Sequence, residues 1–397
     1  MARALPTRSV LTRCAIAASL ITVALSLPGC VQQAPPELLQ AVENLDRHLL
    51  SVQGAEFAPE EYARFIERWV AVKARLQSED DVIRWPWEAN GLVADLLKVE
   101  EEGRQAALVA AERREAERLQ TLAWLTAVER RLRTLGSRVE EMGSRLILGE
   151  KLIETELLVK QGRSFFEQGR FSRSGPVLDE AARLLDDQIA LLNAELGRYA
   201  DERMVDTWRR KVRQTVAWSK RHQAPAIVVS KADRSLTLYH NGGVVASYPV
   251  QLGYNGILEK RYQGDGATPE GQYRVLKKRD RRQTQFYRAL LLDYPNAEDR
   301  QRFRLARNAG IIPVGATIGG QIEIHGLDHR AVSQTLGCIM LENRWIDVLF
   351  DSVDVGTPVT IVGAVKRSNS VALALAALDQ PEEEEDVAFA DSTSDEG

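Results

Sequence analysis

The sequence lacks a run of about 20 apolar residues except near its N-terminus, so the rest of the chain offers no candidate for a membrane-spanning helix. It also has little excess charge, because 52 basic residues are matched by 56 acidic ones. The imbalance comes mostly from the ends: residues 381–397 hold eight acids and no base, and residues 1–29 hold three arginines. The body between them is nearly neutral, which gives no electrostatic reason to expect a nucleic-acid partner.

The composition excludes a mostly disordered or collagen-like chain, since 44% hydrophobic and 27% charged residues are near the average for globular proteins. A length of 397 residues predicts two or three domains with enough core to fold unaided. The C-terminal segment 364–397 is the exception. Its acidic end buries too little apolar surface to offset the entropy of ordering, so we predict a disordered tail, with an interaction tail as the alternative. The alanine-rich run within it, 368–379, is a terminal helix or nothing.

The N-terminus has the pattern of an export signal. Arg8 and Arg13 precede an uncharged run of fourteen residues, which is too short to span a membrane. The sequence Leu27-Pro-Gly-Cys30 that follows resembles a bacterial lipobox. Residues 1–29 are therefore predicted to be a lipoprotein-type signal peptide, and Cys30 to carry lipid that anchors the protein to a membrane of the cell envelope. An ordinary cleaved signal or an uncleaved short anchor is the alternative.

Gln32 follows Cys30 at a position where lipoproteins retained in the inner membrane often carry aspartate. This difference favours the periplasmic face of the outer membrane. With Cys14 removed and Cys30 lipidated, Cys338 is the one remaining thiol and cannot form an intramolecular disulfide. A single cysteine in an exported protein is either a nucleophile or a small buried core residue.

Residues 30–222 have the composition of helical and coiled-coil proteins, with many Ala, Glu, Leu, Arg and Lys residues and few turn signals. Tyr62, Phe65, Ile66 and Trp69 fall on one face of a helix. A heptad pattern spans 125–153 and predicts a coiled-coil seam; its positions are Leu125, Val128, Leu132, Leu135, Val139, Met142, Leu146, Gly149 and Ile153. Its partner helix comes from this chain as an antiparallel hairpin, from a second copy, or from another envelope protein.

Residues 223–363 have the pattern of a β-dominated domain. Apolar β-branched runs at 226–230 and 235–239 are followed by a hairpin turn at 240–243 and a further strand at 244–252. The last strand is expected near 358–362. The fold class is therefore α+β and multidomain: an all-α N-terminal region followed by a domain made mainly of strands.

Two short segments in this domain carry the chemistry. The strand Ile322-Glu-Ile-His325-Gly326 presents a histidine beside a glycine, and Thr335-Leu-Gly337-Cys338 follows it. A cysteine paired with a histidine base has a lowered pKa and attacks carbonyl carbon, which predicts acyl transfer through a thioester. The alternatives are a buried core cysteine and a hydrogen-bonded structural histidine, and His329 is a second candidate for the base.

The same residues resemble the signature of the YkuD-type L,D-transpeptidase domain: a histidine-glycine pair, then Ser333, then Gly337-Cys338 and an apolar residue. Three more segments match in order, at 235–239, 264–273 and 356–361. The segment Tyr294-Pro-Asn296 is similar to the YafK-like subgroup. The resemblance covers about a third of the chain and does not extend to the helical region.

This resemblance implies that Cys338 attacks a peptidoglycan stem peptide and that His325 is the general base. It further implies that backbone N–H groups at Gly337 and Cys338 bind the oxyanion, and that a carbonyl near Gly326 orients the imidazole. Residues placed near the substrate are Ser333, Thr335 and Tyr294, and packing in the domain is the alternative role of Tyr294. No metal and no organic cofactor is required.

An amine that resolves the acyl-enzyme gives a crosslink, whereas water gives hydrolysis, as in an L,D-carboxypeptidase or the release of murein-bound lipoprotein. A catalytically silent wall scaffold that works through its coiled coil is the alternative from another class. The sequence also departs from the family, because Leu336 stands where many members have histidine and Met340 where they have arginine. A thioether cannot form the bidentate pair with a carboxylate that arginine forms.

Overall fold

The computed structural model describes residues 34–78, 91–143, 145–327 and 335–379. The predicted signal peptide, Cys30 and the acidic stretch 380–397 lie outside the described residues. The chain forms two compact units, which divide between Leu122 and Ala123. The change in sequence pattern had predicted a boundary about 100 residues later, between residues 222 and 223.

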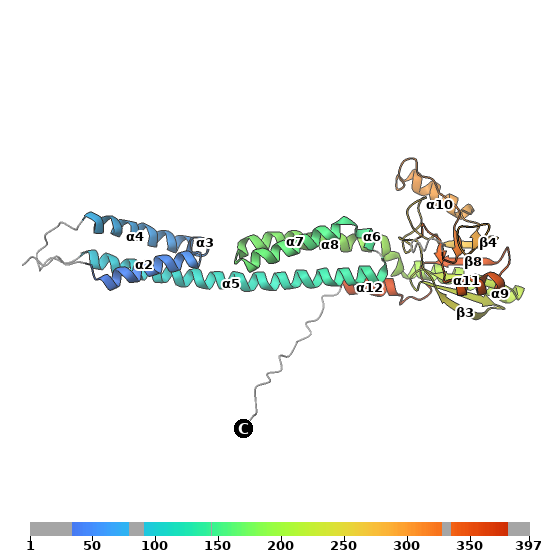
Figure 1. Ribbon diagram of the computed structural model, residues 1–397, viewed down its shortest axis with the longest axis horizontal. Coiled ribbons are helices and arrows are strands. Elements are labelled where there is room, and N and C mark those ends of the chain that lie inside the picture. The colour runs from blue at the N-terminus through green and yellow to red at the C-terminus, as the bar shows by residue number, and fades with distance from the viewer. Residues whose placement is uncertain (1–33, 79–90, 144, 328–334, 380–397) are drawn as a thin grey trace, which may run out of the picture. The chain divides into compact units, whose positions relative to one another are not determined.

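The first unit is helical. It contains α2 (Pro36–Ser51), α3 (Gly54–Phe57), α4 (Pro59–Ser78) and the first part of α5 (Gly91–Met142) (Figure 1). The apolar face predicted within 62–69 lies on α4, where Phe65 and Trp69 are buried and Tyr62 and Ile66 pack beside them. These side chains share one core with Val42 and Leu49 of α2 and Leu96 of α5. Val72 of α4 and Leu92 and Val99 of α5 belong to the same core.

The second unit begins with the rest of α5 and continues as α6 (Arg145–Leu148), α7 (Glu150–Glu167) and α8 (Phe171–Leu196). Helices α7 and α8 form a hairpin. Val128, Leu135 and Val139 of α5 are buried in one core with residues of both helices. The antiparallel partner from the same chain is therefore present, and these seam positions are covered without a second copy.

The predicted continuous seam over 125–153 is wrong beyond Met142. Helix α5 ends there, and both Gly143 and Gly149 have positive φ values, 62° and 54°. Glycine adopts this left-handed conformation without steric cost and commonly ends a helix. Ile153, the last seam position, is 57% exposed on α7.

A short 3-10 turn, η1 (Gly197–Tyr199), and helix α9 (Glu202–His222) lead into the sheet. The eight strands lie in the order β3-β2-β1-β8-β4-β5-β6-β7. Their bounds are β1 Pro225–Ser230, β2 Ser235–His240, β3 Gly243–Pro249, β4 Gly271–Asp280, β5 Arg288–Leu292, β6 Glu323–His325, β7 Ile339–Met340 and β8 Pro358–Val362. Neighbouring pairs are antiparallel except β1 with β8 and β6 with β7, which are parallel.

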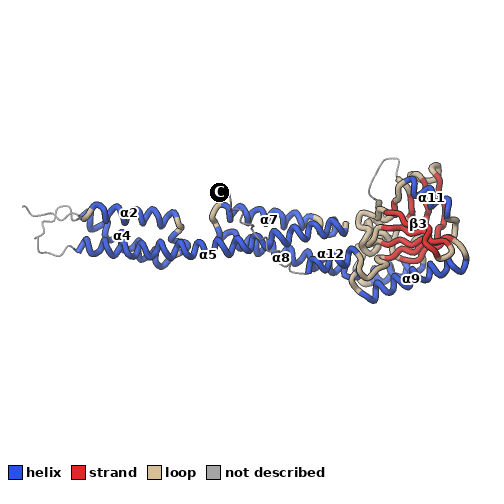
Figure 2. Tube along the Cα trace, turned by 90° about the horizontal axis from the view of Figure 1, so that it is seen from below, coloured by secondary structure: helices blue, strands red, loops and turns tan. Residues whose placement is uncertain are grey.

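Helices cover both faces of this sheet (Figure 2). Ile227 and Val229 of β1 are buried in a core that includes Ile346 of α11 (Asn343–Ser352). Val228, which points to the other face, shares a core with Trp208 of α9. Burial on both faces explains why β1 is a continuous apolar run instead of an alternating one. A further helix, α10 (Ala297–Asn308), begins with Asn296 as its N-cap.

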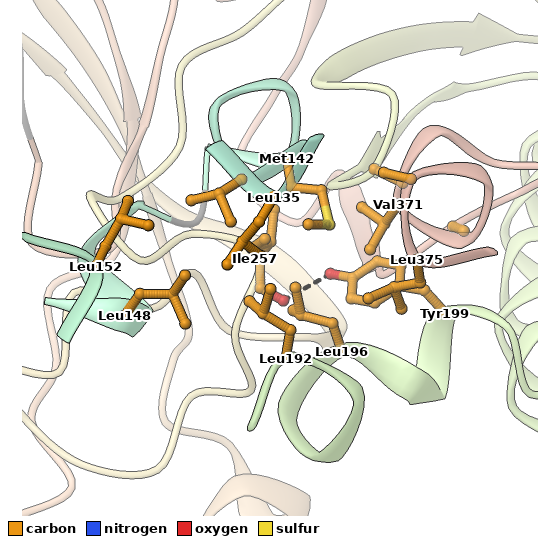
Figure 3. Close-up of a cluster of buried hydrophobic side chains, with 14 of the residues drawn as sticks. Leu135, Met142, Leu148, Leu152, Leu192, Leu196, Tyr199, Ile257, Val371 and Leu375 are labelled. Carbon is orange, nitrogen blue, oxygen red and sulfur yellow. Dashed lines mark hydrogen bonds between the residues drawn. The ribbon is translucent and has the colours of Figure 1, made fainter. Parts of the chain in front are cut away.

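The C-terminal segment is ordered where the structure describes it. Residues Ser370–Asp379 form α12, and Val371 and Leu375 are buried in the core that also contains Leu196 and Ile257 (Figure 3). The prediction of a disordered tail over 364–397 is therefore wrong for 370–379, because the apolar side chains of the alanine-rich run are buried in a core of the same unit. The alternative of a terminal helix is confirmed.

In the parts of the chain described here, no helix combines the length and the apolarity that crossing a lipid bilayer requires.

Candidate active site

A cavity of about 680 Å³ in the second unit is lined by both residues singled out from the sequence, His325 and Cys338. It lies where β6 and β7 meet the β4–β5 connection and the long loop between β3 and β4. Its other lining residues are Lys260, Gln263, Gly264, Arg279, Gln283, Thr284, Gln285, Phe286, Gly319, Gly320, Gln321, Ile322, Glu323, Thr335 and Leu336.

Pairing of two short parallel strands brings the histidine and the cysteine together. Ile324 lies opposite Ile339, and His325 lies opposite Met340. Cys338 therefore comes directly before the strand that neighbours His325. The sheet, not the thirteen-residue separation in sequence, determines their proximity.

The imidazole of His325 is held in one orientation. Its Nδ1 lies 2.6 Å from the carbonyl oxygen of Gly326, and the ring of Phe286 stacks on it with centroids 3.6 Å apart. A carbonyl oxygen only accepts hydrogen bonds, so Nδ1 carries the proton and Nε2 is the basic nitrogen of the neutral ring. A main-chain carbonyl at this place is the contact that the family resemblance implied.

Glycine is required at position 326 by the close approach of α11. A Cβ atom there would lie 2.6 Å from Oδ1 of Asn343 and 2.9 Å from Cγ2 of Ile346. That amide oxygen accepts a hydrogen bond from the N–H of Leu327. The glycine thus lets the end of β6 dock against the helix that supports it.

Cys338 is partly buried, and its sulfur contacts the backbone just before β6. The N–H of Glu323 donates to Sγ at 3.4 Å, and the thiol donates to the carbonyl oxygen of Gln321 at 3.7 Å. Burial raises the pKa of Cys338 to about 11; the Glu323 N–H opposes this rise, and the Glu323 carboxylate adds to it. The lowered pKa expected for the cysteine is therefore wrong for this structure, because burial outweighs the Glu323 N–H and the charge of Lys260, which both favour the thiolate.

The turn before Cys338 has an unusual backbone. Gly337 has φ of 126°, and a Cβ atom there would lie 2.6 Å from the carbonyl oxygen of Ala267. The hydroxyl of Thr335 donates to the carbonyl oxygen of Cys338 at 2.8 Å. Thr335 thus lines the cavity and also shapes the turn that presents the thiol.

Tyr294 lies elsewhere. It is 7% exposed, its ring meets that of Tyr273 edge to face, and its hydroxyl donates to the carbonyl oxygen of Ile318 at 3.1 Å. It is not among the lining residues of the cavity described above, so its predicted place beside the substrate is not supported. Two further candidates, Ser333 and His329, lie between His325 and Cys338 in the sequence and are outside the described residues.

Among the lining residues that were not singled out from the sequence, four carry a charge or an aromatic ring: Lys260, Arg279, Phe286 and Glu323. Phe286 stacks on His325; Arg279 pairs with Glu323 at 2.7 Å; and Lys260 pairs with Asp265 at 2.6 Å. Burial raises the pKa of Glu323, and the charge of Arg279 opposes that rise. Glu323 had a signal, because it lies two residues before His325 in a strand and therefore faces the same side. Arg279 and Lys260 had none, since only the fold brings them to the cavity.

The two departures from the family pattern occupy different environments. Leu336 is 69% exposed and lines the cavity, whereas Met340 is 3% exposed and lies opposite Gln251 in the sheet. Met340 is thus a core residue here. Within the described residues, no group of three or more His, Cys, Asp or Glu side chains is placed to hold a metal ion.

Comparison with known proteins finds a family match for the part of the chain that contains the sheet and the cavity. Residues 224–361 match the family model described as the L,D-transpeptidase catalytic domain, YkuD. The resemblance found from the sequence motifs is confirmed, as is the α+β fold class. The match covers the sheet and its cavity and leaves the helices before residue 224 outside it.

Known relatives and solved structures are each similar to about a third of this chain. The chain is 30% identical over 131 residues to the "Putative L,D-transpeptidase YafK" of Escherichia coli K12, covering 32% of this chain and 46% of that relative. The chain thus spans about half the length of the curated relative. L,D-transpeptidase 1 of Mycobacterium tuberculosis is 23% identical, covering 35% of this chain and 62% of that one, with a TM-score of 0.21.

Proposed function

We propose that the protein is a cysteine-dependent L,D-transpeptidase that acts on peptidoglycan stem peptides, with Cys338 as nucleophile and His325 as general base. The observation that carries the proposal is that both side chains line one cavity within the segment that matches the L,D-transpeptidase catalytic domain. Solitary thiols are often core residues, but this one faces a polar cavity beside an oriented imidazole.

The raised pKa of Cys338 determines how the reaction starts. At neutral pH the resting site holds a thiol, so the proton leaves during the attack instead of before it. Nε2 of His325 takes that proton as Sγ bonds to the carbonyl carbon of the donor peptide. The resulting imidazolium returns the proton to the leaving amine, the C–N bond breaks, and a thioester remains on Cys338.

Charge on the tetrahedral intermediate needs donors at the nucleophile turn. The N–H groups of Gly337 and Cys338 are the candidates, since the positive φ of Gly337 sets the direction of the peptide units on both sides of it. Thr335 holds the turn through the Cys338 carbonyl. An acceptor amine, or water, then attacks the thioester, His325 accepts its proton, and the thiol is restored.

Substrate binding is assigned to the polar wall of the cavity. Lys260 and Arg279 supply positive charge, and Gln263, Gln283 and Gln321 supply amide groups. A stem peptide carries free carboxylates and many amide groups, which this set of side chains matches. Among the described lining residues Arg279 is the arginine; one of its N–H groups bonds to Glu323, and we assign the others to a substrate carboxylate.

Product analysis tests the proposal. The protein beginning at residue 31 is incubated with tetrapeptide-bearing muropeptides, with and without an added amine acceptor, and the products are separated and identified by mass. We expect a crosslinked or amine-exchanged product, lost in Cys338→Ala and reduced at least a hundredfold in His325→Ala. Release of the terminal residue without crosslinking would instead assign the hydrolytic reaction to the same dyad.

We further propose that the protein works in the periplasm, anchored to the outer membrane by lipid on Cys30. The lipobox-like sequence carries this proposal, and a peptidoglycan substrate is consistent with it. Mass analysis of the protein purified from membranes tests it: a diacylated N-terminal cysteine is expected, and an unmodified terminus would contradict it. Whether copies associate through the helical region is measured in the same preparation by light scattering.

A further inference from the structure

The loop between β3 and β4, residues 250–270, forms one wall of the cavity. Lys260, Gln263 and Gly264 line it. The same loop supports the nucleophile turn: the N–H of Tyr254 donates to the carbonyl oxygen of Thr335 at 3.0 Å. The position of this loop therefore determines both the shape of the substrate wall and the support of the turn that holds Cys338.

The C-terminal end of α8 and the η1 turn bind this loop through hydrogen bonds and ion pairs. Both elements lie outside the segment that matches the family. Arg198 makes a bidentate pair with Glu270, at 2.9 and 2.7 Å, and donates to the carbonyl oxygen of Ile257 at 2.8 Å. The hydroxyl of Tyr199 donates to the same carbonyl oxygen at 2.7 Å. Glu195 of α8 pairs with Arg261, beside the cavity-lining Lys260, at 3.0 Å.

These contacts are shielded from water. The side chains of Arg198 and Glu270 are 16% and 14% exposed, and Tyr199 is fully buried. Ile257 packs in the same apolar cluster as Leu196 and Leu375, with the Tyr199 hydroxyl pointing at its carbonyl (Figure 3). Hydrogen bonds to charged groups in such surroundings are stronger than surface ion pairs.

Glu270 has a second partner, so the contact between Arg198 and the loop can be removed and its effect measured. The ammonium of Lys231, on the first residue after β1, bonds to Glu270 at 2.8 Å and to the carbonyl oxygens of Leu258 and Thr268. Loss of Arg198 therefore leaves the buried carboxylate paired with Lys231. A variant at Arg198 removes the contact from the helical region without creating an isolated buried charge.

We propose that the C-terminal end of α8 and the η1 turn belong to the active site. Arg198 and Glu195 act as positioning residues, which hold residues 257–264 of the cavity wall in the position that binds substrate. The helical region thereby controls substrate binding: any displacement of α8 moves the wall that carries Lys260. The effect on reaction rate rests on the proposed function, whereas the effect on the loop does not.

The test compares Arg198→Met with Arg198→Lys and Glu195→Gln. The matched control is Arg163→Met, because Arg163 of α7 also makes a bidentate pair, with Glu129 of α5, and does not contact the loop. Hydrogen–deuterium exchange of the substrate-free proteins is measured first. We expect exchange in 257–264 to rise about tenfold or more in Arg198→Met, less in Arg198→Lys and Glu195→Gln, and not at all in the control.

Kinetics on stem-peptide substrate supply the second measurement. Arg198→Met is expected to raise KM about tenfold with kcat changed by less than about threefold, and Arg198→Lys to recover part of the loss. Wild-type exchange in the loop of Arg198→Met would overturn the proposal. So would a uniform rise throughout the chain that Arg198→Lys fails to reduce, since that would mean a role in overall stability alone. If the wild type has no activity, the proposed function fails and exchange still decides this inference.

Discussion

At the scale of single residues, the central feature is the thiol of Cys338, the proposed nucleophile, which is protonated at neutral pH. Burial raises the pKa of the Cys338 thiol to about 11, above its ordinary value of 9.0. The sulfur contacts backbone at Gln321 and Glu323, and His325 is oriented by Gly326. A protonated thiol reacts slowly with electrophiles, so the proposed reaction requires His325 to take the proton during attack.

Thiol alkylation measures this protonation state. For a group with a raised pKa, the thiolate fraction is small at pH 7 and increases about tenfold per pH unit until the pKa is reached. We expect the rate of Cys338 alkylation by iodoacetamide to rise steadily from pH 7 to pH 10, with Cys338→Ala as the unlabelled control. A rate that is already constant between pH 7 and pH 8 would contradict the buried thiol.

The sequence motifs were enough to expect Cys338 and His325 in one cavity, where the structure has them, but not to predict their electrostatics. Cys338 and His325 each have a glycine neighbour and lie in an ordered set of motifs. The pKa of the thiol depends on which groups surround the sulfur, and those come from the fold. For Tyr294 the motif left two roles open, beside the substrate or in packing, and the structure shows its side chain packed in the core.

At the scale of elements, the loop 250–270 is stabilised by a buried charge cluster. Burial alone would raise the pKa of Glu270, but the charges of Lys231 and Arg198 outweigh it and lower the pKa to about 2. Burial lowers the pKa of Lys231 to about 8, although Glu270 opposes this. The cluster therefore depends on an ionised carboxylate at the base of the cavity wall.

This dependence predicts a loss of stability in acid. Since the pKa of Glu270 is lower in the folded protein than in the unfolded chain, its stabilisation is complete above about pH 4.5 and is lost as pH falls toward 2. We expect the free energy of unfolding, measured by urea titration, to decrease over this range more steeply than in Glu270→Gln. The variant is also expected to be about 2 kcal/mol or more less stable at pH 7. If the free energy of unfolding had the same pH dependence in the wild type and in Glu270→Gln, the role assigned to Glu270 would be contradicted.

Element boundaries illustrate what a sequence pattern leaves out. The heptad positions from Leu125 to Met142 do form a buried helix face, but two glycines with positive φ interrupt the helix before Ile153. Heptad spacing records apolar positions and carries no information on φ. Likewise the alanine-rich run near the C-terminus was ambiguous by itself, because its order depends on Leu196 and Tyr199 as packing partners.

At the scale of the whole molecule, the sheet is completed by segments outside the family match. Helix α9 covers one face, where the hydroxyls of Thr215 and Thr360 lie 2.5 Å apart and the indole of Trp208 fills the space over Gly363. Helix α12 extends the same core through Val371 and Leu375. The change of sequence pattern near residue 223 marks where strands begin, not where the folded unit begins.

Truncation tests this organisation. A fragment of residues 224–363 exposes the apolar face that α9 covers, whereas a fragment of residues 123–379 retains the described part of the second unit. We expect the shorter fragment to be destabilised by several kcal/mol, and so to melt at least about 10 °C lower or to fail to fold. Equal melting temperatures in differential scanning calorimetry would contradict the role given to α9 and α12.

The most direct test of the central claim is the intact mass of the protein after incubation with tetrapeptide-bearing muropeptide. We expect an acyl adduct on the wild-type protein, mapped by peptide mass to Cys338 and absent from Cys338→Ala. The adduct should form much more slowly in His325→Ala, whose thiol remains present. A thioester on Cys338 would be contradicted by either of two results. One is a folded wild-type protein whose Cys338 can be alkylated but never forms the adduct; the other is an adduct that persists in Cys338→Ala.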